Sequence, residues 1–174
     1  HTMMMTDLPD QEAVDRYLPL LDLKHRLTDR PRVMGGLDFP HETEAHRSQG
    51  AAAMARVPAV YAECQDAFEE IFGRRPADPV VPYCMDDAET VLVSMGTTAS
   101  TVRAAVDAAR ERGQKVGALR VRMFRPFPEQ ALREQLAGRS RIGVLDRDLS
   151  PGMGGILWSE LRGTAPAACV IQNY

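Results

Sequence analysis

The stretch that decides the fold runs from Thr90 to Gly96 and reads TVLVSMG. Its β-branched and apolar residues are typical of a buried strand, and the glycine marks the end of that strand. Residues 97–112 follow, with Val102, Val106 and Ala109 at the spacing of one helical face. The segment therefore predicts one step from strand to helix.

Further strands and helices alternate along the rest of the chain. We predict strands at 116–123, 141–146 and 168–172, and helices at 126–136 and 154–161. Strands that alternate with helices in this way form a parallel sheet with helices on both faces and right-handed crossovers. The expected fold is an α/β three-layer sandwich with a mainly parallel sheet.

A long helix is predicted upstream of these strands, over residues 41–72. Its apolar residues recur at spacings of three and four and line one face: Met54, Val57, Tyr61, Cys64, Phe68 and Ile71. This stripe favours a helix packed on its own domain over a coiled-coil seam. Pro58 is expected to kink the helix or to start a second one, and residues 79–82 are predicted to form a linker.

Residues 1–40 are predicted to form an extended arm. They contain four prolines and one short helical candidate, Gln11 to Leu18, for which Asp10 is a suitable N-cap. A leader of this length usually wraps a neighbour or links two domains. We therefore expect an arm at 1–40 and an α/β domain at 41–174, with a helical part at 41–75 and a strand–helix core at 88–174.

Composition and charge exclude several classes of protein. A net charge of −3 over 174 residues, without a basic block, gives no reason to expect nucleic acid or an anionic membrane as a partner. The apolar runs are far shorter than the roughly 20 residues of a membrane span, and no signal-peptide pattern opens the chain. A cytoplasmic protein is expected.

The three cysteines, Cys64, Cys84 and Cys169, lack the spacing of disulfides or metal ligands. They are expected to be small core residues.

The first candidate site is the sequence Gly96-Thr97-Thr98, at the predicted turn between the strand and the following helix. Free N–H groups at a helix N-terminus can bind phosphate. The three glycines of a dinucleotide fingerprint are missing, however. Capping of the helix by Thr97 or Thr98 is therefore favoured over nucleotide binding.

The second candidate is the loop from Asp146 to Gly155, which follows the third predicted strand. It can hold an anion at the helix start of Gly154 and Gly155, or a metal on the paired carboxylates of Asp146 and Asp148. The alternative is a turn that simply caps the next helix. No lysine follows the glycines, which excludes a phosphate loop.

The third candidate is the turn at residues 122–128, which reads RMFRPFP. Arg125 can bind a carboxylate or a phosphate through two parallel hydrogen bonds. Alternatively, Phe124 and Phe127 plug the sheet edge, while the arginines pair locally or across an interface. No residue pattern in the sequence proposes a complete general acid–base pair, so no catalytic residue is predicted. A capping turn is favoured over a metal at Asp146 and Asp148.

Several of these segments, in this order, resemble a known family. They are His1-Thr2-Met3, Leu8 to Asp15, Leu18-Pro19, His46-Arg47, Met95-Gly96-Thr97, Val116-Gly117 with Arg120, Phe124 to Pro128, and Asp146-Arg147-Asp148 with Gly152. Together they resemble the alpha subunit of pyruvate:ferredoxin oxidoreductase and related 2-oxoacid oxidoreductases. The resemblance covers that subunit's core domain II, which is similar to the C-terminal domain of transketolases.

The resemblance implies a parent enzyme that oxidatively decarboxylates a 2-oxoacid, with pyruvate expected, and transfers the acyl group to coenzyme A. It implies thiamine diphosphate, magnesium and iron–sulfur clusters held elsewhere, subunits of beta, gamma and delta type, and ferredoxin or flavodoxin as the electron acceptor. This domain is implied to be scaffold and interface. The family's pyrimidine-binding domain, with its activating glutamate, precedes the segment that begins at His1, and a glycine-rich segment and a helix follow the last strand. A piece truncated at both ends is therefore expected.

Residues near the active centre or a subunit interface are then expected at the ends of the strands: Gly96, Thr97, Arg125, Asp146, Asp148, Gly154 and Gly155. Two other functions remain open. One is a stand-alone Rossmann-like module that binds a nucleotide or coenzyme A at residues 96–98. The other is a purely structural interaction domain whose arm, residues 1–40, wraps a partner.

Overall fold

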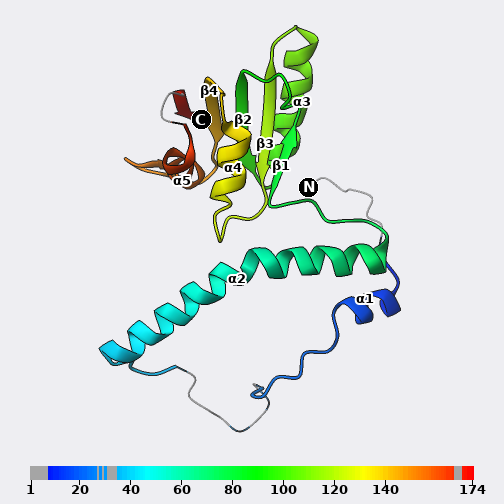
Figure 1. Cartoon of the computed structure of the whole chain (residues 1–174), viewed down its shortest axis with the longest axis vertical. Coiled ribbons are helices and arrows are strands. Elements are labelled where there is room, and N and C mark those ends of the chain that lie inside the picture. The colour runs from blue at the N-terminus through cyan, green and yellow to red at the C-terminus, as the bar shows by residue number, and fades with distance from the viewer. Residues whose placement is uncertain (1–7, 27, 29, 31–34, 167–169) are drawn as a thin grey trace. The chain divides into compact units, whose positions relative to one another are not determined.

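The computed structural model describes residues 8–26, 28, 30, 35–166 and 170–174. The chain divides into two compact units, residues 1–76 and residues 77–174 (Figure 1). The first unit contains two helices and the second contains the sheet. The long helix thus shares a unit with the arm, while the expected domain start at residue 41 stays a prediction.

The first unit is built from helix α1 (Gln11–Tyr17) and helix α2 (Pro40–Phe72). The carboxylate of Asp10 accepts a hydrogen bond from the Ala13 N–H at 2.7 Å, so the predicted N-cap is confirmed. The Tyr17 ring packs edge-on against Phe68 and Phe72, with ring centroids 5.2 and 5.6 Å apart. These aromatic contacts join α1 to the end of α2.

Pro58 lies inside α2, which continues through it as one helix. Figure 1 shows the helix changing direction near its middle, as expected where a proline removes one backbone hydrogen bond.

The apolar stripe of α2 is only partly covered: Met54 is 48% exposed. Cys64 is exposed as well, so its prediction as a core residue is wrong. The buried residue of α2 is Gln65, which donates to the Pro76 carbonyl at 2.8 Å.

The second unit confirms the predicted mixed α/β fold. Its main sheet has the strand order β1-β3-β2-β4-β7, and every neighbouring pair except β1 and β3 is parallel. The strands are β1 (Val80–Tyr83), β2 (Thr90–Met95), β3 (Val116–Val121), β4 (Arg141–Leu145) and β7 (Val170–Asn173). The helices are α3 (Thr98–Glu111), α4 (Glu129–Leu136) and α5 (Ile156–Thr164). A two-stranded ladder pairs β5 (Leu149–Ser150) with β6 (Gly154–Gly155).

Alternating side chains of β2 divide the core between the two faces of the sheet. Val91 and Val93 belong to the larger cluster, which also holds buried leucines of α4 and α5. Leu92 packs against the smaller cluster, which holds Val102 and Val106 of α3. Because successive strand residues point to opposite faces, α3 covers one face, and α4 and α5 cover the other. This arrangement is the predicted three-layer sandwich.

The predicted linker at 79–82 is wrong, because residues 80–83 form the edge strand β1. This strand is antiparallel to β3, with Pro82 opposite Leu119. Two prolines hid the strand from sequence analysis, yet an edge strand tolerates proline, since one side of its backbone needs no partner.

The other predicted elements are present with shifted ends. β3 stops at Val121, and α4 begins at Glu129. The start of the last predicted strand and the predicted core residue Cys169 lie outside the described residues. Among the helices that the structure describes, none has the length and apolar character that crossing a membrane requires.

Candidate functional site

The parallel strands bring the predicted site residues to one edge of the sheet, where the strands have their carboxyl ends. Ser94 of β2 lies beside Leu145 of β4, and Met95 lies beside Val121 of β3. The chain leaves β2 toward β3 on one side and returns to β4 on the other. The gap between the ends of β2 and β4 is therefore a topological switch point, the usual ligand position in such sheets. Gly96 and Asp146 flank it.

The carboxylate of Asp146 occupies the N-terminus of α5. Its Oδ2 accepts a hydrogen bond from the Trp158 N–H at 2.9 Å. The approach is so close that a Cβ atom on Gly155 would lie 1.9 Å from this oxygen. Gly155 therefore has to be glycine because the Asp146 side chain lies against its backbone. The predicted alternative, a turn that caps the next helix, describes this arrangement.

Burial raises the pKa of Asp146 above its ordinary value of 3.8, and it outweighs the hydrogen bonds from the backbone that lower this pKa. The nearby charge of Asp148 raises the pKa further. Asp148 itself is exposed. Two neighbouring carboxylates, one of them already bound to a helix N-terminus, repel the phosphates of an anionic cofactor. The arrangement does not fit a diphosphate at this helix start.

The rest of the loop is held by local contacts. The Gly155 N–H donates to the Asn173 side-chain oxygen at 2.8 Å, and this residue comes from the neighbouring strand β7. Gly154 has a φ of +92°, and a Cβ there would lie 2.9 Å from the ring of Trp158. Both glycines are thus required by packing. Among the residues that the structure describes, no group of three His, Cys, Asp or Glu side chains could hold a metal ion.

The N-terminus of α3 lacks such a carboxylate. Thr97 stands at the N-cap position, but its side chain makes no capping hydrogen bond, so its predicted capping role is wrong. Its backbone carbonyl accepts from the Ser100 N–H at 3.1 Å instead. Gly96 provides the turn with a φ of +62°. The predicted phosphate or nucleotide site at residues 96–98 stays untested by this geometry.

Arg125 pairs with a residue of its own domain, which is the predicted alternative to binding a carboxylate or phosphate ligand. Its Nη2 donates to Oε1 of Glu160 in α5 at 2.5 Å, and its guanidinium lies 4.3 Å from the centroid of the Phe124 ring. Phe124 and Phe127 meet edge-on at 6.0 Å and pack against the larger core cluster. This turn thus joins the end of β3 to α5.

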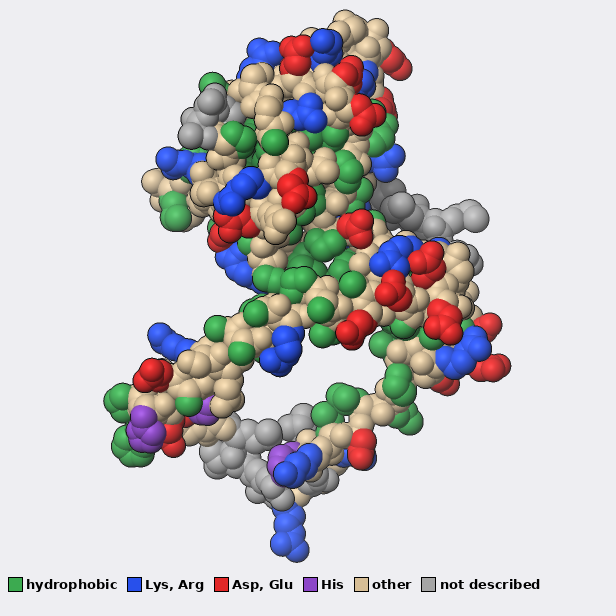
Figure 2. All heavy atoms as spheres, in the orientation of Figure 1, with side chains coloured by type: hydrophobic (Ala, Val, Ile, Leu, Met, Phe, Trp, Pro, Cys, Tyr) green, Lys and Arg blue, Asp and Glu red, His purple; other side chains and the backbone are tan. Residues whose placement is uncertain are grey.

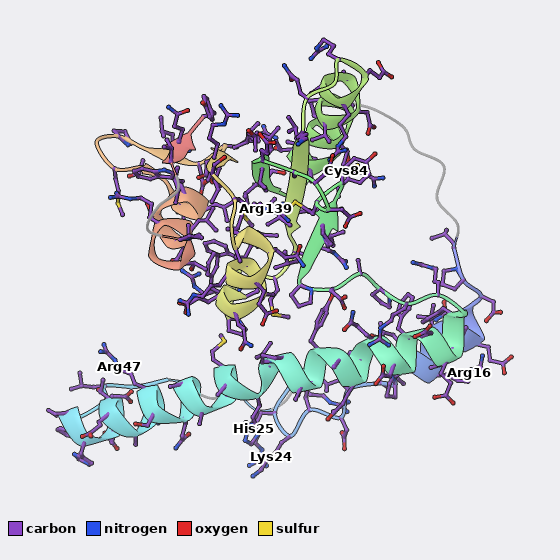
Figure 3. All side chains as sticks on the ribbon, turned by 45° about the horizontal axis from the view of Figure 1, so that its top comes forward. Arg16, Lys24, His25, Arg47, Cys84 and Arg139 are labelled. Atoms are coloured by element: carbon purple, nitrogen blue, oxygen red, sulfur yellow. The ribbon has the colours of Figure 1, made fainter. Side chains whose placement is uncertain are left out.

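Two cavities stand out among the described residues of the second unit, and none of the predicted site residues lines either of them. The larger, of about 700 Å³, lies at the amino ends of the strands, between Glu89, Lys115 and Arg141. Arg139, labelled in Figure 3, lies near that end and donates to the Ala88 carbonyl at 2.6 Å. The smaller, of about 210 Å³, lies on the face of the sheet that α3 covers.

None of the residues around the smaller cavity was predicted as a site residue, among them Ser94, Arg103 and Arg120, although Arg120 belongs to one of the family motifs. Ser94 is 1% exposed, and its hydroxyl has no hydrogen-bond partner among the described residues. One signal was available: it is a hydroxyl residue inside an otherwise apolar strand.

Elsewhere, charged side chains do not gather into an obvious site. Figure 2 shows acidic and basic side chains interspersed on the visible face of the second unit. In the first unit, Arg16, Lys24, His25 and Arg47 are spread along the arm and α2 (Figure 3).

Comparison with known proteins gives the family. Residues 88–173 match the model of pyruvate:ferredoxin oxidoreductase core domain II. "Pyruvate synthase subunit PorA" of Thermotoga maritima is 43% identical over 144 residues, which are 83% of this chain and 35% of that protein. The subunit of the same name from Methanothermobacter thermautotrophicus is 35% identical over 92% of this chain and 42% of its own.

One further relative carries the name of another activity. "Ketoisovalerate oxidoreductase subunit VorA" of Pyrococcus abyssi is 35% identical over 100% of this chain and 45% of its own. A solved structure is titled "2-oxoglutarate:ferredoxin oxidoreductase from Magnetococcus marinus with 2-oxoglutarate, coenzyme A and succinyl-CoA bound". The aligned region comprises 78% of this chain and 20% of the chain in that structure, with 15% sequence identity and a TM-score of 0.47.

The chain thus spans less than half the length of the curated relatives named here. The family resemblance on the sequence motifs is confirmed by these matches. Residues 88–173, which hold most of the sheet and α3 to α5, belong to the pyruvate:ferredoxin oxidoreductase core domain II family.

Proposed function

We propose that this chain is a scaffold and interface part of the alpha subunit of a 2-oxoacid:ferredoxin oxidoreductase, and that it is not catalytic by itself. The observation that carries the proposal is the 43% identity to a pyruvate synthase subunit over 83% of the chain. The matched family model is named for the same enzyme.

The parent enzyme would oxidatively decarboxylate a 2-oxoacid, transfer the acyl group to coenzyme A and pass the electrons to ferredoxin or flavodoxin. The relatives' names support this class, since they cover pyruvate and ketoisovalerate. We propose pyruvate as the substrate on the 43% identity to one pyruvate synthase subunit alone; other pyruvate synthase subunits, such as those at 33% and 35%, and the ketoisovalerate subunits at 35% and 36%, are equally similar to this chain.

The cofactors of the parent, namely thiamine diphosphate, magnesium and iron–sulfur clusters, would be held by other domains and subunits. Support comes from the carboxyl edge of the sheet, where Asp146 is hydrogen-bonded to α5 and Arg125 is paired with Glu160. These side chains hold the domain together instead of presenting a cofactor site. We derive no chemical step from them.

We propose that the same edge faces the neighbouring domains in the assembled enzyme. The residues concerned are Gly96, Thr97, Arg125, Asp146, Asp148, Gly154 and Gly155. Gly96, Thr97, Arg125 and Asp148 are exposed, so they are accessible to a neighbour. The others fix the shape of the loop.

The arm supports an interface role for the first unit. Leu20 and Leu21 are 101% and 76% exposed, and Leu18 is 64% exposed. Contiguous exposed apolar side chains mark surfaces that other proteins cover. We propose subunits of beta, gamma and delta type as partners, with the arm lying against one of them.

Co-expression with the thiamine diphosphate-binding beta-type subunit tests this proposal. The tagged 174-residue chain should retain that subunit on a column, and deletion of residues 1–39 should abolish the retention. The double variant Leu20→Asp/Leu21→Asp should weaken it, whereas Val170→Asp, at an exposed residue at the amino end of β7, should not. Retention that survives the deletion unchanged would contradict the role of the arm. A wild-type chain that captures no subunit would contradict the interface function.

A further inference from the structure

The cavity of about 210 Å³ lies between the first two turns of α3 and the strands β1, β2 and β3. We infer that it binds a phosphate group, as a free ion or as part of a phosphate ester. Its polar lining side chains are Tyr83, Ser94, Ser100, Arg103 and Arg120. This inference does not depend on the proposed function, because none of these residues belongs to the predicted site.

The buried hydroxyl of Ser94 points to a missing ligand. Ser94 is 1% exposed and lines the cavity, yet its Oγ has no partner among the described residues. An unsatisfied buried polar group costs about 1–3 kcal/mol. A ligand with acceptor oxygens in the cavity would relieve that cost.

The register of the strands places positive charge beside this hydroxyl. Ser94 of β2 is paired with Arg120 of β3, and Arg120 is in turn opposite Val81 of β1. Ser94 and Arg120 lie on the face that α3 covers, because Leu92 and Ala118, two positions away, pack in the α3 cluster. One arginine and one hydroxyl therefore converge on the cavity from adjacent strands.

A second arginine approaches from α3. The guanidinium of Arg103 lies 4.4 Å from the centroid of the Tyr83 ring, which fixes its position at the cavity. No acidic side chain lines the cavity. The Asp107 carboxylate accepts a hydrogen bond from the Tyr83 hydroxyl at 2.6 Å. Among the described residues, neither Arg103 nor Arg120 forms an ion pair. Arg103 also interacts with the Tyr83 hydroxyl, so Arg120 provides the charge that is most available to a ligand.

The first turn of α3 adds the hydroxyl of Ser100 and the positive end of the helix dipole. Ala99 and Ser100 line the cavity, and α3 has 14 residues with no side-chain cap at Thr97. Its N-terminal N–H groups thus carry the positive end of the helix dipole without a bound carboxylate. The arginines and hydroxyls thus supply hydrogen-bond donors, and the helix start adds positive potential. This donor set suits a tetrahedral oxyanion better than a planar carboxylate.

Titration of the 174-residue chain with inorganic phosphate, followed by amide NMR at constant ionic strength, tests the inference. Saturable shifts should appear at Ala99, Ser100 and Arg120, and be absent in a chloride titration. Arg120→Gln should weaken the affinity about tenfold, and Ser94→Ala about fivefold. Arg112→Gln, a matched change at the C-cap of the same helix, should leave the affinity unchanged.

A parallel titration with adenosine monophosphate distinguishes the sources of the phosphate group. Tighter binding that still requires Arg120 would assign the cavity to a phosphate ester, and equal affinity would assign it to the free ion. Ser94→Ala should be at least as stable as the wild type, because it removes a buried hydroxyl that lacks a partner. The absence of saturable binding, or binding that Arg120→Gln leaves unchanged, would overturn the inference.

Discussion

The N-termini of α3 and α5 both follow strands of the parallel sheet, α3 directly after β2 and α5 after β4 and the β5–β6 ladder, yet the two helix starts are satisfied differently. At α5, the Asp146 carboxylate from the end of β4 binds the Trp158 N–H, and Gly155 leaves room for it. At α3, no side chain caps the helix, and Arg103 and Arg120 lie at the neighbouring cavity. One helix start is filled by the protein's own anion, whereas the other is left open.

The difference distinguishes a helix N-terminus that stabilises the fold from one that is open to a ligand. An occupied helix N-terminus stabilises the domain but cannot take a ligand. An open one leaves its N–H groups to solvent or to an external anion. Variants at the two helix starts and at the turn beside them separate the two cases.

Gly155→Ala should have the largest effect, a loss of about 3 kcal/mol in the free energy of unfolding. The new Cβ would lie 1.9 Å from Asp146 Oδ2, so the carboxylate must move and the helix loses its cap. Chemical denaturation measures the loss. Gly163→Ala, the same change in the same helix, meets no atom within 4 Å and should not destabilise. Equal effects of the two variants would contradict the close packing of Asp146.

Asp146→Ala should cost about 1–2 kcal/mol, the usual cost of a lost helix cap. Asp146→Asn should keep most of the stability near neutral pH, since its amide oxygen can still accept from the Trp158 N–H. Thermal or chemical unfolding of both variants provides the measurement. If alanine is tolerated as well as asparagine, Asp146 does not act as a cap.

The pKa of Asp146 predicts a pH dependence with a definite sign. Because burial raises this pKa in the folded state, the native protein binds more protons than the unfolded chain above about pH 4. The contribution of Asp146 to stability therefore falls as the pH rises from the unfolded pKa through the folded one. Relative to Asp146→Asn, the wild type should lose stability across this window. A difference that is constant with pH would refute the raised pKa.

Glu160→Gln should cost at most about 1 kcal/mol, because its ion pair with Arg125 is partly exposed. The loss should shrink in high salt, which screens the pair. Denaturation at low and high salt checks both points. A salt-independent loss would instead indicate altered packing of α5.

Thr97→Ala should have the smallest effect, less than about 0.5 kcal/mol, because this side chain makes no capping bond. A capping threonine would cost about 1 kcal/mol or more when replaced. Denaturation alongside Asp146→Ala gives the comparison directly. A loss as large as that of Asp146→Ala would show that the start of α3 is capped after all.

Most of the fold was predictable because local patterns determine it. The run from Thr90 to Met95 and the helix after it follow from residue type and spacing alone. The edge strand β1 was missed, since Pro79 and Pro82 look like a linker until β3 supplies a partner. Local sequence also could not tell the two helix starts apart. Asp146 reaches its helix across the loop of β5 and β6, whereas Thr97, a good capping residue by type, leaves its helix uncapped.

The resemblance of short motifs found the family, and the matched residues 88–173 confirm it. The cavity of Ser94 and Arg120 could not be predicted in the same way. It depends on which strands are neighbours and on which face of the sheet each side chain points to.

Calorimetric titration of the 174-residue chain with thiamine diphosphate and Mg²⁺ tests the scaffold role most directly. The expected result is no Mg²⁺-dependent binding in the micromolar range, because the helix start at Asp146 is already filled. Weak heat that disappears in Arg120→Gln would belong to the phosphate cavity and leaves the scaffold role intact. Micromolar, Mg²⁺-dependent binding that persists in Arg120→Gln would contradict a scaffold function for this chain.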